Sequence, residues 1–242
     1  MELNVFENQD ITIIELAHFL IKTGNESIQD HGRFTLCLSG GSSPKKLYSL
    51  LANVGYREKI DWTKVFFFFG DERYVPQTHP DNNYLMVKSV LFDPLSIPET
   101  QIFPFHTELT AQEAGRSYYK RISDFFGGEP IQFDLVLLGL GDNSHTASLF
   151  PHTSILNDTL PGSSEVYLED QKIFRLSINA PLINQANKIA FLVFGEGKAE
   201  AVHHILEGAK NISEYPAQLI KPVKGKLFWF MDKEAASKIH NL

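Results

Sequence analysis

Cysteine is almost missing from this sequence of 242 residues, which contains only Cys37. A single cysteine excludes an intrachain disulfide, and it also excludes thiolate clusters and Cys-x-x-Cys motifs. Chains without disulfides are typical of reducing compartments. The first ten residues, "MELNVFENQD", lack the basic start and the long apolar segment of a secretory signal peptide. We therefore expect a cytoplasmic protein.

Long apolar runs and an excess of positive charge are absent as well. The longest apolar stretches have the length of a strand, far short of the ~20 residues that cross a bilayer. Lysine and arginine number 22 against 29 acidic residues, for a net charge of −7. Nucleic-acid affinity comes mostly from lysine and arginine on phosphate. We therefore expect neither a membrane nor a nucleic-acid partner, and an anionic ligand would need a local cluster of donors.

The sequence also lacks internal repeats and Ser/Gly-rich linkers, so we predict a single domain spanning residues 1–242. Strand-like runs alternate with helical patterns. Several runs ("VFFFF", "FDLVLL", "IAFLVF") are almost continuously apolar, which is typical of strands covered on both faces. This order predicts an α/β fold with a doubly wound, mostly parallel sheet. The predicted strands are residues 3–6, 34–38, 65–69, 133–138, 173–178, 189–194 and 226–231.

Helical periodicity and capping signals mark the segments between these strands. Residues 10–29 have apolar side chains at helical spacing. Thr110 and Glu113 form a capping-box pattern for a helix that runs to about residue 126. A further helix is predicted to start near Lys198, and Asp232 is predicted to cap a last one. Residues 156–170 are predicted as a long loop, either a functional lid or a mobile surface segment.

Ligands of such folds bind at the carboxyl ends of the strands, and "LSGGSSPKKLY" follows the strand at 34–38. Ser42 or Ser43 is predicted to cap the next helix, with Pro44 as its first residue. Backbone N–H groups at such a start can bind an anion. An ordinary turn with solvated lysines is the alternative. The candidate phosphate-binding residues are Ser39, Gly40, Gly41, Ser42 and Ser43.

A second polar segment, "FFGDERYVP", follows the strand at 65–69 and contains Asp71, Glu72 and Arg73. The planar guanidinium of arginine suits phosphate or carboxylate. The alternative is a local ion pair together with a helix cap for "DNNYLM". We treat Asp71 and Arg73 as candidate site residues.

The third segment, "GLGDNSHTASLFP", places His145 just beyond the strand at 133–138. Its glycine spacing is a weak match to a dinucleotide fingerprint, because Ser144 takes the third position and no acidic residue follows at the required distance. Imidazole can take and return a proton near neutral pH. A histidine that only satisfies a turn is the alternative.

Two cations complete the predicted cluster. Arg175 alternates with apolar neighbours in "FRLSIN", so it points either into a cleft or to solvent from an edge strand. Lys198 begins a helix after two glycines, where the helix dipole disfavours a cation unless an anion lies beside it. Arg73, Arg175 and Lys198 would supply the donors that an anionic ligand needs.

Taken in order, "LSGGSSPKKLY", "FFGDERYVP" with "HPDNNYLM", "DLVLLGLGDNSHTASLFP", "FRLSINAPLINQA" and "VFGEGKAEAV" resemble the 6-phosphogluconolactonase family. The tail adds "YPAQLI" and "FWFMDKEAA". That family is grouped with glucosamine-6-phosphate isomerases/deaminases and shares with them a Rossmann-like three-layer α/β/α sandwich. The deaminases have a Glu-containing segment after the histidine and Asp-Glu-Tyr in place of Asp-Glu-Arg. Both differences favour the lactonase.

The resemblance implies hydrolysis of 6-phospho-D-glucono-1,5-lactone to 6-phosphogluconate, the second step of the oxidative pentose phosphate pathway. It implies no metal or cofactor, a sugar-phosphate substrate as the partner, and a monomer or small homo-oligomer. His145 would be the general base. Arg73 or backbone N–H groups would stabilise the oxyanion, and the phosphate would bind residues 39–43, Arg175 and Lys198.

One departure from the family concerns the residues before the histidine, which are usually Asp-Gly and here are Asn143 and Ser144. Asparagine can orient an imidazole but brings no charge, so it should raise the histidine pKa less than aspartate would. Asn143 suffices, or Asp142 or Asp71 substitutes, or activity is reduced; we expect activity. The alternatives are a sugar-phosphate isomerase/deaminase and a catalytically weakened sugar-phosphate-binding protein.

Overall fold

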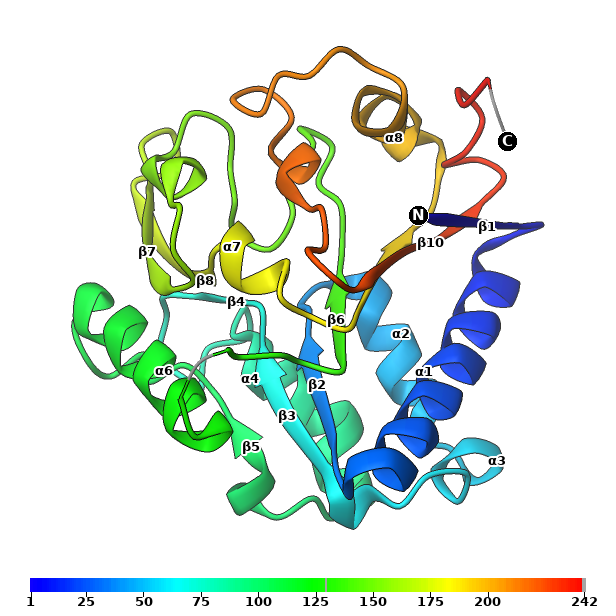
Figure 1. The fold of residues 1–242 in the computed structure, drawn as a ribbon, viewed down its shortest axis with the longest axis vertical. Coiled ribbons are helices and arrows are strands. Elements are labelled where there is room, and N and C mark those ends of the chain that lie inside the picture. Colours follow the sequence, from blue (N-terminus) through cyan, green and yellow to red (C-terminus); the bar gives the residue numbers. More distant parts are fainter. Residues whose placement is uncertain (129, 241–242) are drawn as a thin grey trace.

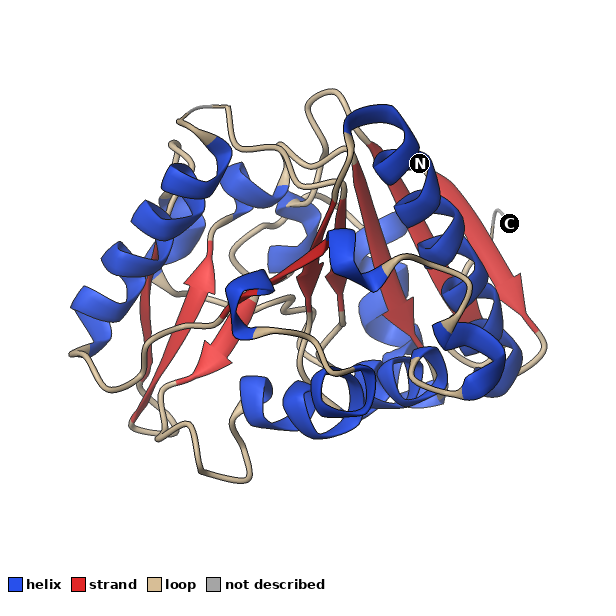
Figure 2. Cartoon of the chain, turned by 90° about the horizontal axis from the view of Figure 1, so that it is seen from below, coloured by secondary structure: helices blue, strands red, loops and turns tan. Residues whose placement is uncertain are grey.

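The central element of the fold is a seven-stranded sheet in which every pair of neighbouring strands is parallel (Figure 1). A computed structural model describes residues 1–128 and 130–240. The strand order is β1-β10-β9-β6-β2-β3-β5, and helices flank the sheet (Figure 2). The predicted doubly wound, three-layer α/β/α fold is confirmed. The strands are β1 (Glu2–Phe6), β2 (Phe34–Leu38), β3 (Val65–Phe69), β5 (Ile102–Phe103), β6 (Leu135–Leu138), β9 (Lys188–Val193) and β10 (Lys226–Asp232).

A second, three-stranded sheet is antiparallel, in the order β4-β8-β7. Its strands are β4 (Asp71–Arg73), β7 (Ser163–Leu168) and β8 (Ile173–Ile178). The prediction was therefore wrong on two counts. Residues 173–178 form a strand outside the parallel sheet, and residues 163–168 form a strand inside the stretch expected to be a loop. Pairing partners depend on tertiary contacts, because a strand pattern alone does not choose its sheet.

The longer helices end close to their predicted positions. Helix α1 (Gln9–His31) is capped by Asn8, whose side chain accepts a hydrogen bond from the N–H of Ile11. Helix α6 (Ala111–Phe126) begins with the predicted capping box of Thr110 and Glu113. The remaining α-helices are α2 (Ser42–Leu51), α3 (Val54–Arg57), α4 (Asn83–Val87), α5 (Asp93–Leu95), α7 (Ala180–Ile183) and α8 (Ala199–Leu206).

The predicted C-terminal helix is absent: residues 233–238 form turns. Asp232 does accept the expected hydrogen bond from the N–H of Ala235, at 2.8 Å. Both of its carboxylate oxygens also accept from the N–H of Gly195, at 3.0 and 3.1 Å. The carboxylate therefore holds the loop after β9 in place, and a segment this short does not overcome the cost of helix nucleation.

Packing of α1 and α6 positions the two sheets. Helix α1 contacts β1, β2, β9 and β10, and α6 contacts β7 and β8 of the small sheet. The hydroxyl of Tyr118 on α6 accepts a hydrogen bond from the N–H of Phe69 at 2.6 Å and donates one to its carbonyl at 2.8 Å. These bonds fix the end of β3 directly before β4. The small sheet is thereby held beside the carboxyl edge of the central sheet.

Candidate active site

A cavity of about 430 Å³ lies where the carboxyl ends of β2, β6 and β9 meet the small sheet. It is lined by the loops that follow these strands and by side chains of β4 and β8. The structure brings together every residue predicted for the site except Asn143, which contacts His145 without lining the cavity. The predicted residues that line it are Ser39, Gly40, Gly41, Ser42, Ser43, Asp71, Arg73, His145, Arg175 and Lys198.

The glycine turn after β2 presents backbone N–H groups to the cavity. Helix α2 begins at Ser42 and is preceded by Gly41 at φ 104°, a conformation that glycine adopts freely. No serine side chain caps the helix, and Pro44 is its third residue, so both capping predictions were wrong. The first N–H groups of a helix lack intrahelical acceptors. They are available to an anionic group in the cavity.

Two side chains that the sequence reading missed hold this turn in place. The hydroxyl of Tyr48 donates to the carbonyl of Ser39 at 2.8 Å and accepts from its N–H at 3.1 Å. A Cβ on Gly40 would lie 1.9 Å from the side chain of Asn83, so only glycine fits there. Asn83 itself donates to the carbonyl of Asp71 at 3.0 Å. The turn is therefore tied to β4, a contact that no local pattern signals.

The "DER" segment supplies the expected helix cap through Glu72 and places Arg73 at the cavity, where its binding role stays a prediction. The buried carboxylate of Glu72 accepts from the N–H groups of Asn83 at 2.7 Å and Tyr84 at 2.9 Å, so it caps α4. Burial raises the pKa of Glu72 to about 7. Arg73 lines the cavity, and its guanidinium donates to the carbonyl of Asp81 at 2.8 Å. The segment thus contributes a helix cap and a cavity cation from adjacent residues.

Neither acidic residue suggested as a substitute partner for the histidine contacts its ring. The carboxylate of Asp71 is buried and accepts from the hydroxyl of Ser148 at 2.7 Å. Burial raises the pKa of Asp71, while the Ser148 hydrogen bond and the charges of Arg73 and Arg175 oppose that rise. Asp142 forms an ion pair with Lys198. The partner of the ring is Asn143.

His145 is half-buried, and its ring is held on three sides. Its Nδ1 lies 2.5 Å from Oδ1 of Asn143, and the ring stacks on Phe150 with centroids 4.0 Å apart. A Cβ on Gly141 would lie 2.1 Å from the ring, so this glycine is required by close approach. An amide oxygen only accepts hydrogen bonds. This contact fits the tautomer with the proton on Nδ1, which leaves a lone pair on Nε2.

The local field keeps this ring neutral. The pKa of His145 falls to about 4, first because of burial and then because of the nearby charges of Lys198, Arg175 and Arg73. Asp142 raises it in part. At neutral pH the imidazole is consequently a neutral ring that can accept a proton.

Ser144 occupies the position at which the family usually has glycine. Its φ is 62°, in the left-handed region that favours glycine, and its side chain is buried. Its carbonyl accepts from the N–H of Ala217 at 3.0 Å. The turn keeps its left-handed geometry without a glycine, at a backbone cost of about 1 kcal/mol.

Three cations converge on the cavity. Arg73 and Arg175 lie directly opposite each other in the β4–β8 pairing, and like charges opposite each other in a sheet are destabilising. The Nε atom of Arg175 is buried and has no hydrogen-bond partner among the described residues. Strand β8 is the middle strand of its sheet and not an edge, and Arg175 lines the cavity. This pair is suited to an anion between the guanidinium groups.

Among the described residues, the group of side chains with metal-ligand geometry lies outside this cavity, on α8 and the C-terminal segment. In the same part of the chain, none of the helices combines the length and the apolar character needed to cross a membrane.

A family model, curated sequences and solved structures all relate the chain to the same family. Residues 7–229 match the family model of glucosamine-6-phosphate isomerases/6-phosphogluconolactonase. A 6-phosphogluconolactonase of Synechocystis sp. is 37% identical over 98% of both chains, and one of Nostoc sp. is 33% identical over 97% of both. A solved structure of 6-phosphogluconolactonase from Trypanosoma brucei aligns with a TM-score of 0.86 at 26% identity, covering 98% of each chain. The chain therefore belongs to the glucosamine-6-phosphate isomerase/6-phosphogluconolactonase family.

Proposed function

We propose that this protein hydrolyses 6-phospho-D-glucono-1,5-lactone to 6-phosphogluconate, the second step of the oxidative pentose phosphate pathway, with His145 as the general base. The observation that carries the proposal is that His145, held by Asn143, lines the same cavity as three cations and a helix start. The names of the Synechocystis and Nostoc relatives support the choice of substrate.

The phosphate of the substrate would bind between the start of α2, Arg175 and Lys198. Charge-assisted hydrogen bonds from guanidinium groups are among the strongest in proteins. The dianion would relieve the repulsion between Arg73 and Arg175 and satisfy the unpartnered Nε atom of Arg175. Binding would also neutralise the charges that depress the pKa of His145. The ring would thus become a stronger base when substrate is present.

In the proposed hydrolysis a single residue, His145, both accepts and returns the proton. Nε2 of His145 takes a proton from water while the water oxygen bonds to the lactone carbonyl carbon. Asn143 accepts from Nδ1–H and keeps the ring oriented as it becomes an imidazolium. Arg73 or backbone N–H groups of the glycine turns would stabilise the oxyanion. The bond from the carbonyl carbon to the ring oxygen then breaks, and that oxygen receives the proton from Nε2.

To test the role of His145, the lactone is formed in situ with glucose-6-phosphate dehydrogenase, and its loss is followed above the spontaneous rate of hydrolysis. We expect clear acceleration that is insensitive to chelators. His145→Ala should reduce kcat by about 100- to 10,000-fold, the usual contribution of a general base. His18→Ala removes an exposed histidine outside the cavity and is the matched control. An unchanged rate in His145→Ala would overturn the assignment of the base.

The same preparation separates the alternatives. Release of ammonia from glucosamine 6-phosphate would indicate the isomerase/deaminase activity of the wider family. Thermal stabilisation by sugar phosphates without turnover would indicate a binding protein instead of an enzyme.

We further propose that residues 1–242 form a single domain that acts in the cytoplasm as a monomer or small homo-oligomer. The support is a cavity built jointly by both sheets and a lone, buried Cys37.

A further inference from the structure

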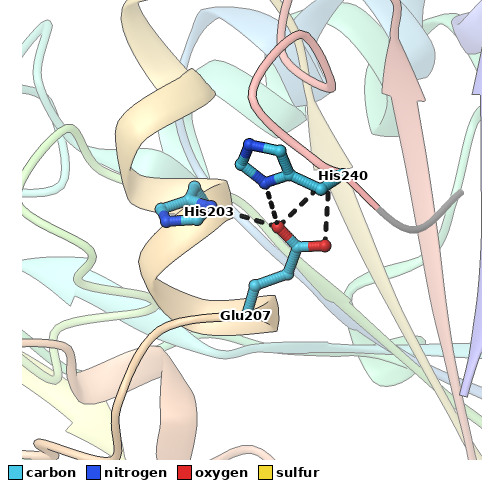
Figure 3. Close-up of side chains that lie close together, drawn as sticks. All are labelled: His203, Glu207 and His240. Atoms are coloured by element: carbon cyan, nitrogen blue, oxygen red, sulfur yellow. Dashed lines mark hydrogen bonds and ion pairs between the residues drawn. The ribbon is translucent and has the colours of Figure 1, made fainter.

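A second group of chemically active side chains lies away from the cavity, where α8 meets the C-terminal segment (Figure 3). His203 and Glu207 are four residues apart, so they share one face of the helix end. His240 comes from the segment that follows β10. None of the three residues lines the cavity that contains His145.

The three side chains converge on one point. Oε2 of Glu207 lies 3.2 Å from Nδ1 of His203 and 2.9 Å from Nδ1 of His240. These three atoms all lie within 4.8 Å of one another. A tetrahedral ion with ligands at 2.0–2.2 Å needs ligand atoms about 3.3 Å apart. Small adjustments of the two rings would therefore admit an ion at the centre of the group.

The carboxylate is already oriented for this role. Oε1 and Oε2 of Glu207 lie 3.0 and 3.2 Å from the backbone N–H of His240, which donates to them. Such a bond outside the ligand set fixes the direction of a metal-binding carboxylate. The side chain of Glu207 is 17% exposed and that of His240 is 75% exposed, so an ion can reach the group from solvent.

We propose that His203, Glu207 and His240 form a surface site for a divalent transition metal of the Zn²⁺ class. Two imidazole nitrogens and one carboxylate oxygen are typical Zn²⁺ ligands, whereas Mg²⁺ and Ca²⁺ prefer oxygen alone. In the bound state each ring ligates through Nδ1 and carries its proton on Nε2. Within the described part of the chain the group consists of these three residues, so water would take the remaining coordination positions.

Binding would join two segments that are distant in the sequence. Helix α8 begins directly after Lys198, which lines the cavity. The ion would bind the C-terminal segment to the C-terminal end of this helix. Because no ligand of this site lines the cavity, the proposal does not depend on the proposed hydrolysis. Its expected effect is higher thermal stability with bound metal.

The test uses the full chain without a histidine tag, freed of metal with a chelator. Co²⁺ replaces Zn²⁺ as a spectroscopic probe, and calorimetry measures Zn²⁺ itself. We expect one ion per chain, visible Co²⁺ absorption bands and an increase in Tm with Zn²⁺. His203→Gln, Glu207→Gln and His240→Gln should each weaken binding about tenfold or more. Mg²⁺ should have no effect.

The matched control is His204→Gln, because His204 follows His203 on the same helix but stacks on Tyr215. This variant should bind Zn²⁺ and Co²⁺ as the unaltered chain does. If one ligand variant is unstable without metal, the other two still test the site. Absence of Co²⁺ bands in the unaltered chain would overturn the proposal. So would an affinity that none of the three ligand substitutions lowers, since the ion would then bind elsewhere.

Discussion

At the scale of single residues, the protonation of His145 is controlled more by cations than by its hydrogen-bond partner. Asn143 orients the ring through Nδ1 but carries no charge. Lys198, Arg175 and Arg73 add to the effect of burial and lower the pKa of the ring to about 4. As the proposed general base, His145 would lose activity only when its ring becomes an imidazolium. The acid limb of kcat/KM reports that protonation in the free protein.

We therefore expect the acid limb of kcat/KM that belongs to the protein to lie near the His145 pKa of about 4. Protonation of the substrate's phosphate dianion adds a separate limb at about pH 6, which is the same for every variant. Asn143→Asp places an anion beside the ring, favours the imidazolium and should move the His145 limb to higher pH by about 1 pH unit. Asp142→Asn removes an acid that raises the same pKa and frees Lys198, so it should move the limb the opposite way. A pH profile of kcat/KM for the three proteins measures both shifts. Identical His145 limbs would contradict the electrostatic account.

At the scale of elements, the pairing of β4 with β8 places two arginine residues opposite each other. Arg73 and Arg175 are register partners, and burial together with the charge of Arg73 lowers the pKa of Arg175. Stability given up at a binding site is a common cost of function. The destabilisation from this like-charge pair should disappear when the charge of Arg175 is removed.

Arg175→Met should consequently raise the free energy of unfolding of the free protein by up to about 1 kcal/mol, because a like-charge pair is lost. The same change should increase KM by about 10- to 100-fold, the value of a charge-assisted hydrogen bond. Denaturant unfolding and lactone kinetics measure the two effects. Arg116→Met, at an exposed position of α6, is the control and should change neither. A KM that is unchanged in Arg175→Met would remove this residue from the phosphate site.

At the scale of the whole molecule, the cavity is shared between the two sheets, so ligand binding acts on both. Loops after β2, β6 and β9 supply the glycine turns, His145 and Lys198, while the small sheet supplies the arginines. A ligand that binds only the folded chain stabilises it by mass action. The phosphate should contribute most of this stabilisation.

We expect 6-phosphogluconate to raise the free energy of unfolding by about 2.7 kcal/mol at one hundred times its Kd. Inorganic phosphate should raise Tm by less, and gluconate, which lacks the phosphate, should leave it almost unchanged. Salt should weaken the effect through screening. Thermal unfolding with each compound makes the comparison. An equal shift with gluconate would show that the sugar part and not the phosphate is recognised.

The sequence by itself determined the strands of the parallel sheet except the two-residue β5, together with the glycine turns at their ends and most residues of the candidate site. Turn chemistry and apolar runs act over a few residues, so they can be read locally. Only the tertiary structure decided that β8 joins β4 and β7, that Arg73 faces Arg175, and that Asp71 bonds Ser148 and not His145. It also brought His240 to α8. These contacts join residues far apart in the chain, and the packing that selects them is a property of the whole fold.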